Sequence, residues 1–294
     1  MILKEKLVAA IITYNPDLKS GVLKEQISLI EEHCIKVVLI DNNSQNKEQI
    51  KDLISSFGRT EFVELDRNYG IGYALNIALE IAADTYGSHW LLTLDQDSLF
   101  HPDTIDNAEK EMSAYQLDKN IACFGVNFED LHFKTFKKQN NAGKPIFVKA
   151  LITSGCFMNI EIVKKFKFRN ELFMYSVDTD FSYQLTKKGY KLVLLYRSEM
   201  NHTGGKRKYA VDGCQIHYNE PMAFYYMSRN SIYLFREYYE ISSFLNVLYL
   251  YLENIAAREK PLKCAFNIVK GFIDAIFMNI HKSKNINYKK CFLN

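Results

Sequence analysis

The sequence lacks several patterns that would place it in a familiar functional class. Its six cysteines are scattered and none forms a Cys-x-x-Cys pair, so neither a zinc site nor a redox motif is supported, and we expect reduced, mostly buried thiols. No apolar run reaches the roughly 20 residues that a membrane-spanning helix needs. The short run from Leu7 to Ile12 leads straight into Tyr14, Asn15 and Pro16, which favours a buried strand over a secretion signal. A net charge of only +3 gives no nucleic-acid-binding signal.

What the chain does have is enough apolar material for one large core, or for a domain with an appendage. It is 48% hydrophobic over 294 residues. Charge is unevenly placed, because residues 258–294 contain eight basic and two acidic residues and the rest of the chain is slightly acidic. A basic tail beside apolar helices suggests an anionic surface nearby.

The first 97 residues alternate strand-like apolar runs with helical patterns. The expected strands are 7–13, 36–42, 61–66 and 89–97, and the expected helices are 20–33, 47–57 and 73–85. This order predicts an α/β fold with a mostly parallel, Rossmann-like sheet flanked by helices. Functional groups gather at the C-terminal strand ends of such sheets, and Thr13, Asp41, Asp66 and Asp95 all fall there.

The second half of the chain is mixed and ends in helices. Strands are expected at 120–128, 144–160 and 190–196, helices at 161–166 and 177–189, a loop at 200–215, and long helices from Pro221 and Pro261. We therefore expect a catalytic domain over 1–215 and a helical C-terminal extension over 216–294.

Two groups of acids stand at places where carboxylates can do chemistry. Asp95 and Asp97 follow a buried strand, and their hard oxygens suit Mg²⁺ or Mn²⁺ bridging to phosphates; the alternative is a turn with a helix cap at Ser98. Asp178 and Asp180 open a helix, where one is expected to be structural and the other is a candidate general base.

The sequence lacks the motifs of two enzyme classes that are built on similar α/β sheets. The glycines at 70 and 72 lack the third glycine of a dinucleotide fingerprint and follow the third strand, which excludes an NAD-dependent oxidoreductase and favours a tight turn into the next helix. A nucleotidyltransferase would need a glycine-rich basic loop after the first strand. A catalytically inactive binding module stays open as an alternative, although the retained acids Asp41, Asp95, Asp97 and Asp178 argue against it.

Taken together, several segments resemble family 2 glycosyltransferases with the GT-A fold, closest to the rhamnosyltransferase-like branch of bacterial surface-polysaccharide synthesis. The resemblance spans about residues 8–235. It rests on the segments AAIITYNP (9–16), VLIDNNS (38–44), NYGIGYALN (68–76), LLTLDQDS (91–98), TSGCFMN (153–159), YSVDTDFSYQL (175–185) and YYMSRN (225–230). Two departures are Val177, where many relatives have Glu, and Gln184, where many have Arg.

The resemblance implies a role for each matching position. The residues it assigns to the nucleotide are Thr13, Tyr14, Asp41, Asn68, Asp95 and Gln96; to the metal, Asp97 and His202; to the donor sugar and acceptor, Ser154, Gly155 and Cys156; and to the catalytic base, Asp178.

The expected activity is therefore an inverting sugar transfer that needs a divalent metal. The expected donor is dTDP-rhamnose, with a UDP-sugar as the alternative, and the expected acceptor is a lipid-linked saccharide of a capsular, O-antigen or other surface polysaccharide. We expect a cytoplasmic protein. Whether its C-terminal helices contact the inner face of the plasma membrane, pack on the core or form a homo-oligomer stays open.

Overall fold

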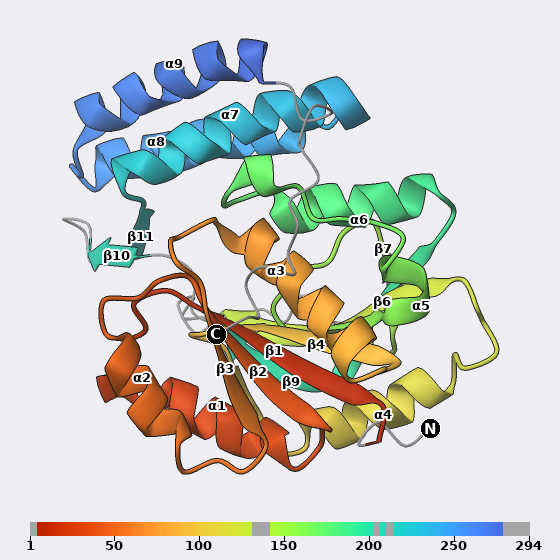
Figure 1. Ribbon diagram of the computed structural model, residues 1–294. Coiled ribbons are helices and arrows are strands. Elements are labelled where there is room, and N and C mark those ends of the chain that lie inside the picture. The colour runs from red at the N-terminus through yellow and green to blue at the C-terminus, as the bar shows by residue number, and fades with distance from the viewer. Residues whose placement is uncertain (1–4, 131–141, 203–205, 210–214, 279–294) are drawn as a thin grey trace. The chain divides into compact units, whose positions relative to one another are not determined.

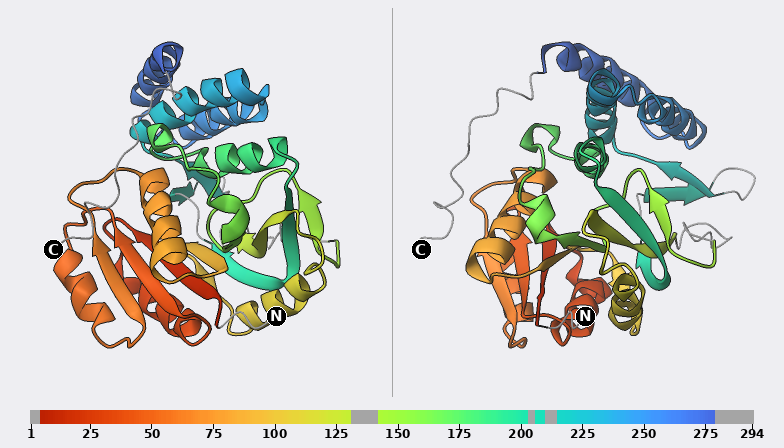
Figure 2. Two further views of the ribbon diagram at one scale, coloured as in Figure 1. Left: turned by 45° about the vertical axis from the view of Figure 1, so that its right-hand side comes forward. Right: turned by 90° about the vertical axis from the view of Figure 1, so that its right-hand side faces the viewer.

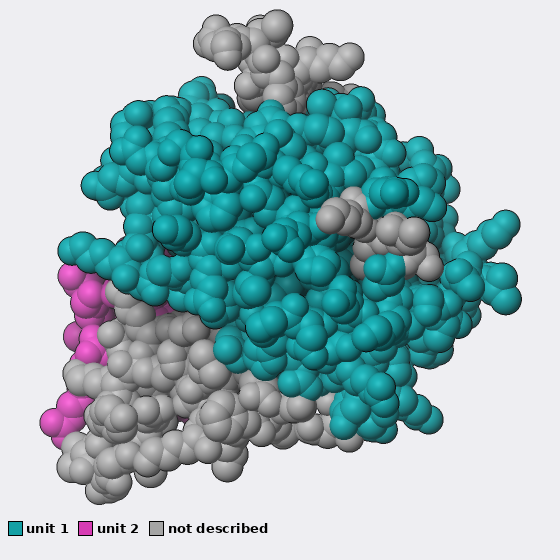
Figure 3. All heavy atoms as spheres, turned by 90° about the horizontal axis from the view of Figure 1, so that it is seen from below, with its two compact units in different colours: residues 1–170, 181–203, 287–294 teal, residues 171–180, 204–286 magenta. Residues whose placement is uncertain are grey.

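The structure, a computed structural model, describes residues 5–130, 142–202, 206–209 and 215–278, and the side chains among them outside 129–130, 202, 206–209 and 215–218. The described residues form two compact units, coloured separately in Figure 3. One contains the described residues of 5–170 and 181–202, and the other contains 171–180 and the described residues of 206–278. The expected boundary after residue 215 thus falls within the second unit.

The first unit is built on a sheet whose N-terminal half is fully parallel (Figure 1). Its strands lie in the order β3-β2-β1-β4. They are β1 (Leu7–Thr13), β2 (Lys36–Asp41), β3 (Thr60–Glu64) and β4 (Trp90–Asp95), and the connecting helices are α1 (Val22–Glu31), α2 (Lys47–Ile54) and α3 (Ile71–Glu80). The predicted alternation of strands and helices is confirmed.

Burial explains why these runs form a sheet covered on two faces. Every residue of β1 is buried, as a strand packed between two helical layers requires. The buried residues of α1 are Leu23, Gln26, Ile27 and Ile30, which repeat at helical spacing. Helices α1 and α3 lie on opposite faces of the sheet (Figure 2). A short π-helical segment (Ile81–Thr85) prolongs α3.

The second half of the sheet is mixed, so the whole sheet is less parallel than predicted. Strand β8 runs antiparallel between β4 and β6, and β9 lies parallel to β6. The remaining elements of this half are β5 (Leu99–Phe100), α4 (Thr104–Ser113), β6 (Ile121–Asp130), β7 (Ile146–Val148), β8 (Cys156–Asn159), α5 (Ile160–Val163), α6 (Val177–Lys187) and β9 (Lys191–His202).

The expected loop at 200–215 is wrong in part. Strand β9 continues to His202, and β10 (Lys206–Tyr209) pairs antiparallel with β11 (Gln215–Tyr218). These strands are short and polar, so they lack the apolar alternation that identifies a strand in a sequence.

The second unit is dominated by three helices, α7 (Pro221–Tyr238), α8 (Ser242–Ala256) and α9 (Pro261–Phe277), which confirms the helix starts predicted at both prolines. Helix α7 packs against the other two (Figure 1). Gly271 permits the close approach of α9 to α7, because an added Cβ would lie 2.5 Å from the carbonyl oxygen of Tyr225. None of the helices in the described ranges is long and apolar enough to cross a membrane.

Candidate functional site

Register brings the predicted nucleotide residues of the first unit to one edge of the sheet. Thr13 pairs with Asp41, and Ile12 pairs with Asp95, so the C-terminal ends of β1, β2 and β4 lie side by side. This is the edge at which open parallel sheets bind ligands. The spatial gathering that the sequence predicted for these strand ends is therefore present.

Asp41, at the end of β2, is enclosed by hydrogen-bond donors from two turns. It is fully buried, and Thr13 Oγ1 donates to its Oδ1 at 2.9 Å. From the other side, the backbone N–H and the hydroxyl of Ser44 donate to Oδ2 and Oδ1 at 2.7 and 2.5 Å. A buried carboxylate needs such partners. Asp41 thus fastens the ends of β1 and β2 to each other, and its contact with a nucleobase stays a prediction.

Gln96 links the turn after β4 to the turn after β1. The backbone N–H of Tyr14 donates to Gln96 Oε1 at 2.7 Å, and Gln96 Nε2 donates to the carbonyl oxygen of Tyr14 at 3.3 Å. Because Gln96 stands between Asp95 and Asp97, this reciprocal pair sets where the two acids lie beside Tyr14. The Tyr14 side chain is about half exposed, as contact with a bound base would require.

Two buried serines also support the acidic turn, which is the segment from Asp95 to Asp97. The backbone N–H of Asp95 donates to Ser154 Oγ at 3.0 Å, and that hydroxyl donates to Ser98 Oγ at 2.8 Å. Asp95 is half-buried and Asp97 is exposed. Ser154 therefore supports the turn that presents the two carboxylates, while its predicted contact with the donor sugar stays a prediction.

Gly155 and Cys156 follow Ser154 into the core. Gly155 adopts a φ of +70°, and a Cβ added there would lie 2.9 Å from Met200 Sδ. The Cys156 side chain is buried and its thiol interacts with that of Cys123, where this hydrogen bond and burial raise the pKa of Cys123 well above its ordinary value. The predicted sugar contact of Gly155 and Cys156 stays a prediction.

Gly155→Ala is expected to destabilise the protein by roughly 1–3 kcal/mol, because a left-handed φ strains alanine and the new methyl group has no room. Thermal unfolding of the purified protein measures the effect as a lower Tm. The matched control is Gly58→Ala, since a Cβ at Gly58 would meet no atom within 4 Å and its φ is not left-handed. Equal melting of the two variants would contradict the packing argument.

Asn68 shapes the entrance to α3. Its Oδ1 accepts a hydrogen bond from the backbone N–H of Gly70 at 2.9 Å, and Gly70 has a φ of 84°. This confirms the predicted tight turn into the helix. Beside it, Tyr69 stacks on Tyr73 with ring centroids 4.3 Å apart, and the Arg67 guanidinium lies 4.4 Å from the Tyr69 ring. Nucleotide binding by Asn68 stays a prediction.

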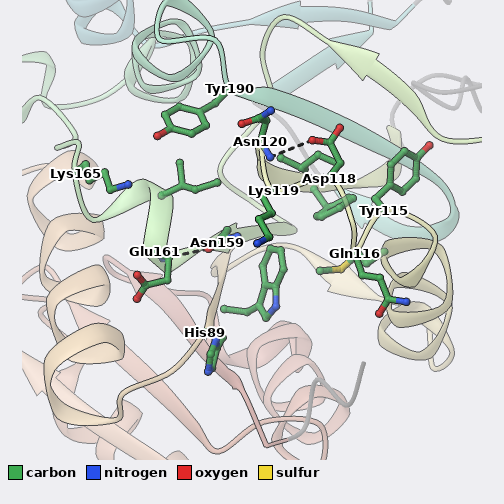
Figure 4. A pocket seen from close by; sticks show the side chains of 15 residues that line it. His89, Tyr115, Gln116, Asp118, Lys119, Asn120, Asn159, Glu161, Lys165 and Tyr190 are labelled. Carbon is green, nitrogen blue, oxygen red and sulfur yellow. Dashed lines mark hydrogen bonds between the residues drawn. The ribbon is translucent and has the colours of Figure 1, made fainter.

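A separate cavity of about 470 Å³ opens at the other edge of the same sheet (Figure 4). It is lined by Trp90, Ile121 and Asn159, among others. Trp90 begins β4, whereas Asp95 ends it. None of the residues that the sequence assigns to the site lines this cavity, so it is distinct from the strand-end group.

The two acids of α6 differ in the way the sequence suggested. Asp180 is fully buried and accepts hydrogen bonds from the hydroxyls of Tyr233 and Tyr238, both at 2.7 Å, which makes it the structural acid. Asp178 is half-buried, and its Oδ1 accepts from the Thr179 backbone N–H at 2.8 Å. Burial raises the pKa of the Asp178 carboxyl. Its role as catalytic base stays a prediction.

The loop before Asp178 has unusual backbone geometry. Phe173, Tyr175 and Ser176 have φ values of 63°, 60° and 59°, the left-handed region that bulky residues rarely adopt. Such residues cost of order 1–3 kcal/mol each and persist only where their surroundings hold them. They lie directly before the helix start that presents Asp178.

Two residues of α7 bind the backbone of this loop, and neither was predicted to have an individual role. The amide nitrogen of Asn230, which is fully buried, lies within hydrogen-bond distance of the carbonyl oxygens of Leu172, Met174 and Tyr175, at 3.1, 2.8 and 2.9 Å. Arg229 Nη2 donates to the carbonyl oxygen of Leu172 at 3.0 Å. Both belong to the YYMSRN segment, so the signal was the motif itself.

The sequence predicts a metal at the acidic turn that contains Asp97, with His202 as a second ligand. Across the side chains that the structure describes, no three of the types His, Cys, Asp and Glu gather into a metal-binding group. The side chain of His202 lies outside the described set. Of the two predicted metal ligands, only Asp97 has a described side chain, and metal binding by Asp97 stays a prediction.

The chain is similar in sequence to proteins of one known family. The model of the family described as glycosyl transferase family 2 matches residues 9–182. The chain is 26% identical over 250 residues to the dTDP-rhamnosyl transferase RfbF of Shigella flexneri, covering 80% of this chain and 81% of that protein.

Two solved structures share the fold at low sequence identity. TarS 1–349 of S. aureus in complex with UDP-GlcNAc has a TM-score of 0.52 at 14% identity, over 92% of this chain and 72% of that one. The mannosyltransferase PcManGT of Pyrobaculum calidifontis, in complex with GDP-Man and Mn²⁺, has a TM-score of 0.55 at 13% identity, over 93% and 76%. The predicted GT-A fold is confirmed.

Proposed function

This chain belongs to glycosyl transferase family 2 and is a glycosyltransferase, and from that premise we propose that it transfers rhamnose from dTDP-rhamnose to a saccharide acceptor with inversion. The supporting observation is the strand-end group of the first unit. There the Tyr14–Gln96 pair sets Asp95 and Asp97 beside the turns that contain Thr13 and Asp41.

The donor site is proposed at this edge of the sheet. Tyr14 supplies an exposed ring for the base, and the turn from Asp95 to Asp97 faces the ribose and diphosphate. The internal hydrogen bonds of Asp41, Ser44 and Ser154 keep these turns in one conformation before the donor arrives. Preorganisation of this kind reduces the entropy that binding must offset.

The acidic turn fits a divalent cation such as Mg²⁺ or Mn²⁺. Its two carboxylates are hard oxygen ligands, and Asp97 is exposed. Asp97 would hold the ion, with Asp95 beside it and His202 as the further ligand that the family resemblance suggests. When bound, the cation neutralises negative charge on the leaving diphosphate.

Asp178 is proposed as the general base. Its carboxylate accepts the proton of the acceptor hydroxyl, and the hydroxyl oxygen forms a bond to the anomeric carbon of the donor. The bond from that carbon to the diphosphate oxygen breaks on the opposite face, so the configuration inverts and the nucleoside diphosphate leaves. A raised pKa makes the Asp178 carboxylate a stronger base than an ordinary aspartate.

The choice of rhamnose rests on similarity to RfbF, whose printed activity is dTDP-rhamnosyl transfer. A UDP-sugar is the alternative, because TarS binds UDP-GlcNAc in a structure of the same fold. The acceptor is proposed to be a lipid-linked saccharide of a bacterial surface polysaccharide, modified in the cytoplasm. A protein that binds the nucleotide sugar without turnover is the remaining alternative.

Donor binding is expected to raise the melting temperature, because a ligand that binds only the folded state stabilises it. At 100 times its Kd, dTDP-rhamnose with Mn²⁺ should add about 2.7 kcal/mol. Differential scanning fluorimetry with dTDP-, UDP- and GDP-sugars measures this shift. Asp97→Asn should reduce the Mn²⁺-dependent part of it, and Asp52→Asn, an exposed acid of α2, should not.

The outcomes separate the alternatives. A shift with a UDP-sugar alone would assign that donor in place of dTDP-rhamnose. A shift with dTDP-rhamnose but no release of dTDP in the presence of acceptor would favour the inactive binding partner. Equal shifts with Mn²⁺ and with chelator would remove the cation from the scheme.

A further inference from the structure

Exposed large hydrophobic side chains are concentrated at the end of the described chain. Among the side chains that the structure describes, 19 large hydrophobic residues are exposed, and 13 of them lie between Tyr239 and Phe277. Scattered surface hydrophobics are ordinary, but a concentration of this size marks an interaction surface. All of these residues belong to the second unit.

Helix α9 has two apolar faces. Its buried residues are Cys264, Ile268, Gly271 and Ala275, and this face lies against α7. A second stripe, at the same helical spacing on the opposite side, points to solvent. It consists of Leu262, Phe266, Val269, Ile273, Ile276 and Phe277, with exposed fractions from 52% to 85%. An ordinary surface helix has a polar outer face instead.

Helix α8 repeats this arrangement. Its buried residues are Val247 and Asn254, while Leu245, Leu248, Tyr249, Leu252 and Ile255 are exposed. The rings of Phe244 and Phe272 stack with centroids 5.6 Å apart, which ties α8 to α9. We call the exposed apolar residues of the two helices the outer stripes.

The charges near the outer stripes are basic and accessible. Lys263 and Lys270, both exposed, flank the α9 stripe on one side, and exposed Arg258 lies between the helices. The acid of α9 is engaged internally, because the Tyr225 hydroxyl donates to Asp274 Oδ2 at 2.8 Å. Glu253 of α8 lies beside the stripe of its own helix, where it accepts from the hydroxyl of exposed Tyr249 at 3.0 Å. The surface thus presents apolar side chains beside cations.

We propose that the outer stripes of α8 and α9 dock on an anionic membrane surface, with the helices lying in the interface. An apolar stripe bordered by lysines is the pattern of helices that lie on a bilayer and do not cross it. A second copy of the chain is a less suitable occupant, since protein–protein interfaces are depleted in lysine. The inference rests on the proposed function in one respect, because a lipid-linked acceptor would be presented at such a surface.

Vesicle sedimentation of the full chain tests the docking without donor or acceptor. The protein should pellet with phosphatidylcholine vesicles that contain one-third phosphatidylglycerol, and less with phosphatidylcholine alone. Phe266→Glu combined with Ile273→Glu should lower the partition coefficient at least about tenfold. Lys263→Glu combined with Lys270→Glu should lower it about tenfold on the anionic vesicles only.

The matched control is Leu117→Glu, which changes a 92% exposed leucine of the first unit and should leave binding unchanged. Circular dichroism melts show whether each variant is folded. The proposal is overturned if the wild type stays in the supernatant, or if the Phe266 and Ile273 variant pellets like the wild type. It is also overturned if light scattering without lipid shows a dimer that this variant splits while no vesicle binding occurs.

Failure of the proposed function is distinguishable from failure of the docking. Donor-induced stabilisation tests the strand-end site of the first unit, and vesicle binding tests the outer stripes of the second. If the protein binds vesicles but no donor raises its Tm, the membrane docking is supported and the proposed donor site is wrong. A donor-induced shift with no vesicle binding would do the reverse.

Discussion

Asp178→Asn is expected to lower kcat by about 10²–10⁴-fold while the Kd of the donor stays unchanged. Removal of a positioned general base costs this much in rate, and the proposed donor contacts are made by other residues. Asparagine is close in size, and its amide oxygen can still accept the hydrogen bond that the Thr179 backbone N–H now gives to Asp178. Release of dTDP with saturating acceptor measures kcat, and calorimetric titration of the donor measures Kd.

Ionisation of the Asp178 carboxyl should also determine how the reaction rate depends on pH. A base works in its ionised form, so the rate falls as pH drops through the pKa of Asp178. Burial raises that pKa, and the acid limb of log(kcat/KM) against pH should therefore lie above the range of an ordinary aspartate. In Asp178→Asn this limb should disappear from the residual activity.

Asp180→Asn is the matched control, since it is a neighbouring acid of the same helix with a structural role. It should lower Tm, because buried Asp180 accepts hydrogen bonds from the hydroxyls of Tyr233 and Tyr238. Asp178→Asn should keep or raise Tm, because a pKa raised in the folded state means that ionisation at neutral pH disfavours folding. Turnover near wild type in Asp178→Asn would show that another group takes the proton.

The positions of the strand ends could be predicted from the sequence because buried parallel strands consist of continuous runs of apolar residues. Thr13, Asp41 and Asp95 each follow such a run, and parallel pairing then brings them to one edge. The antiparallel insertion of β8 between β4 and β6 could not be predicted in this way. Its residues Cys156–Asn159 are buried like those of a parallel strand. Amino-acid composition therefore does not show whether this strand runs parallel or antiparallel to its neighbours.

Side-chain pairing at the site was less predictable than its location. The motif containing Gln96 pointed to the nucleotide, but its reciprocal hydrogen bonds with the Tyr14 backbone depend on the register of β1 against β4. Ser44 was missed as a partner of Asp41 for a similar reason, since its turn curls back on the strand end. Neither pairing follows from residue type or spacing.

The backbone conformation of the loop before Asp178 could not be predicted from the sequence either. Left-handed backbone is usually signalled by glycine or asparagine, and residues 173–176 contain neither. Asn230, more than 50 residues later in the chain, binds the carbonyl oxygens of Met174 and Tyr175 in this loop, and Arg229 binds that of Leu172 just before it. Local residue preferences therefore cannot predict this backbone conformation, because the contacts that stabilise it come from a distant part of the chain.

Asn230→Ala should therefore be among the most damaging substitutions that remove no charge. It would remove the donor that binds the carbonyl oxygens of Met174 and Tyr175, while the Leu172 carbonyl would keep Arg229, at a cost of about 1–3 kcal/mol. The strained loop could then relax and displace Asp178. We expect kcat to fall by about 10–100-fold at a temperature well below Tm, with the Kd of the donor unchanged, because misplacement of a catalytic group by about 1 Å is this costly.

Asn254→Ala separates positioning from stability, because Asn254 is an equally buried amide of the second unit. Its Nδ2 donates to the carbonyl oxygens of Asn219 and Glu259, at 2.8 and 3.3 Å. It should lower Tm to a similar extent and leave kcat near wild type, since neither bond reaches the loop before Asp178. If both alanine variants lose activity only in proportion to the protein that has unfolded, Asn230 supports the fold alone and the proposed coupling of its loop to the base is wrong.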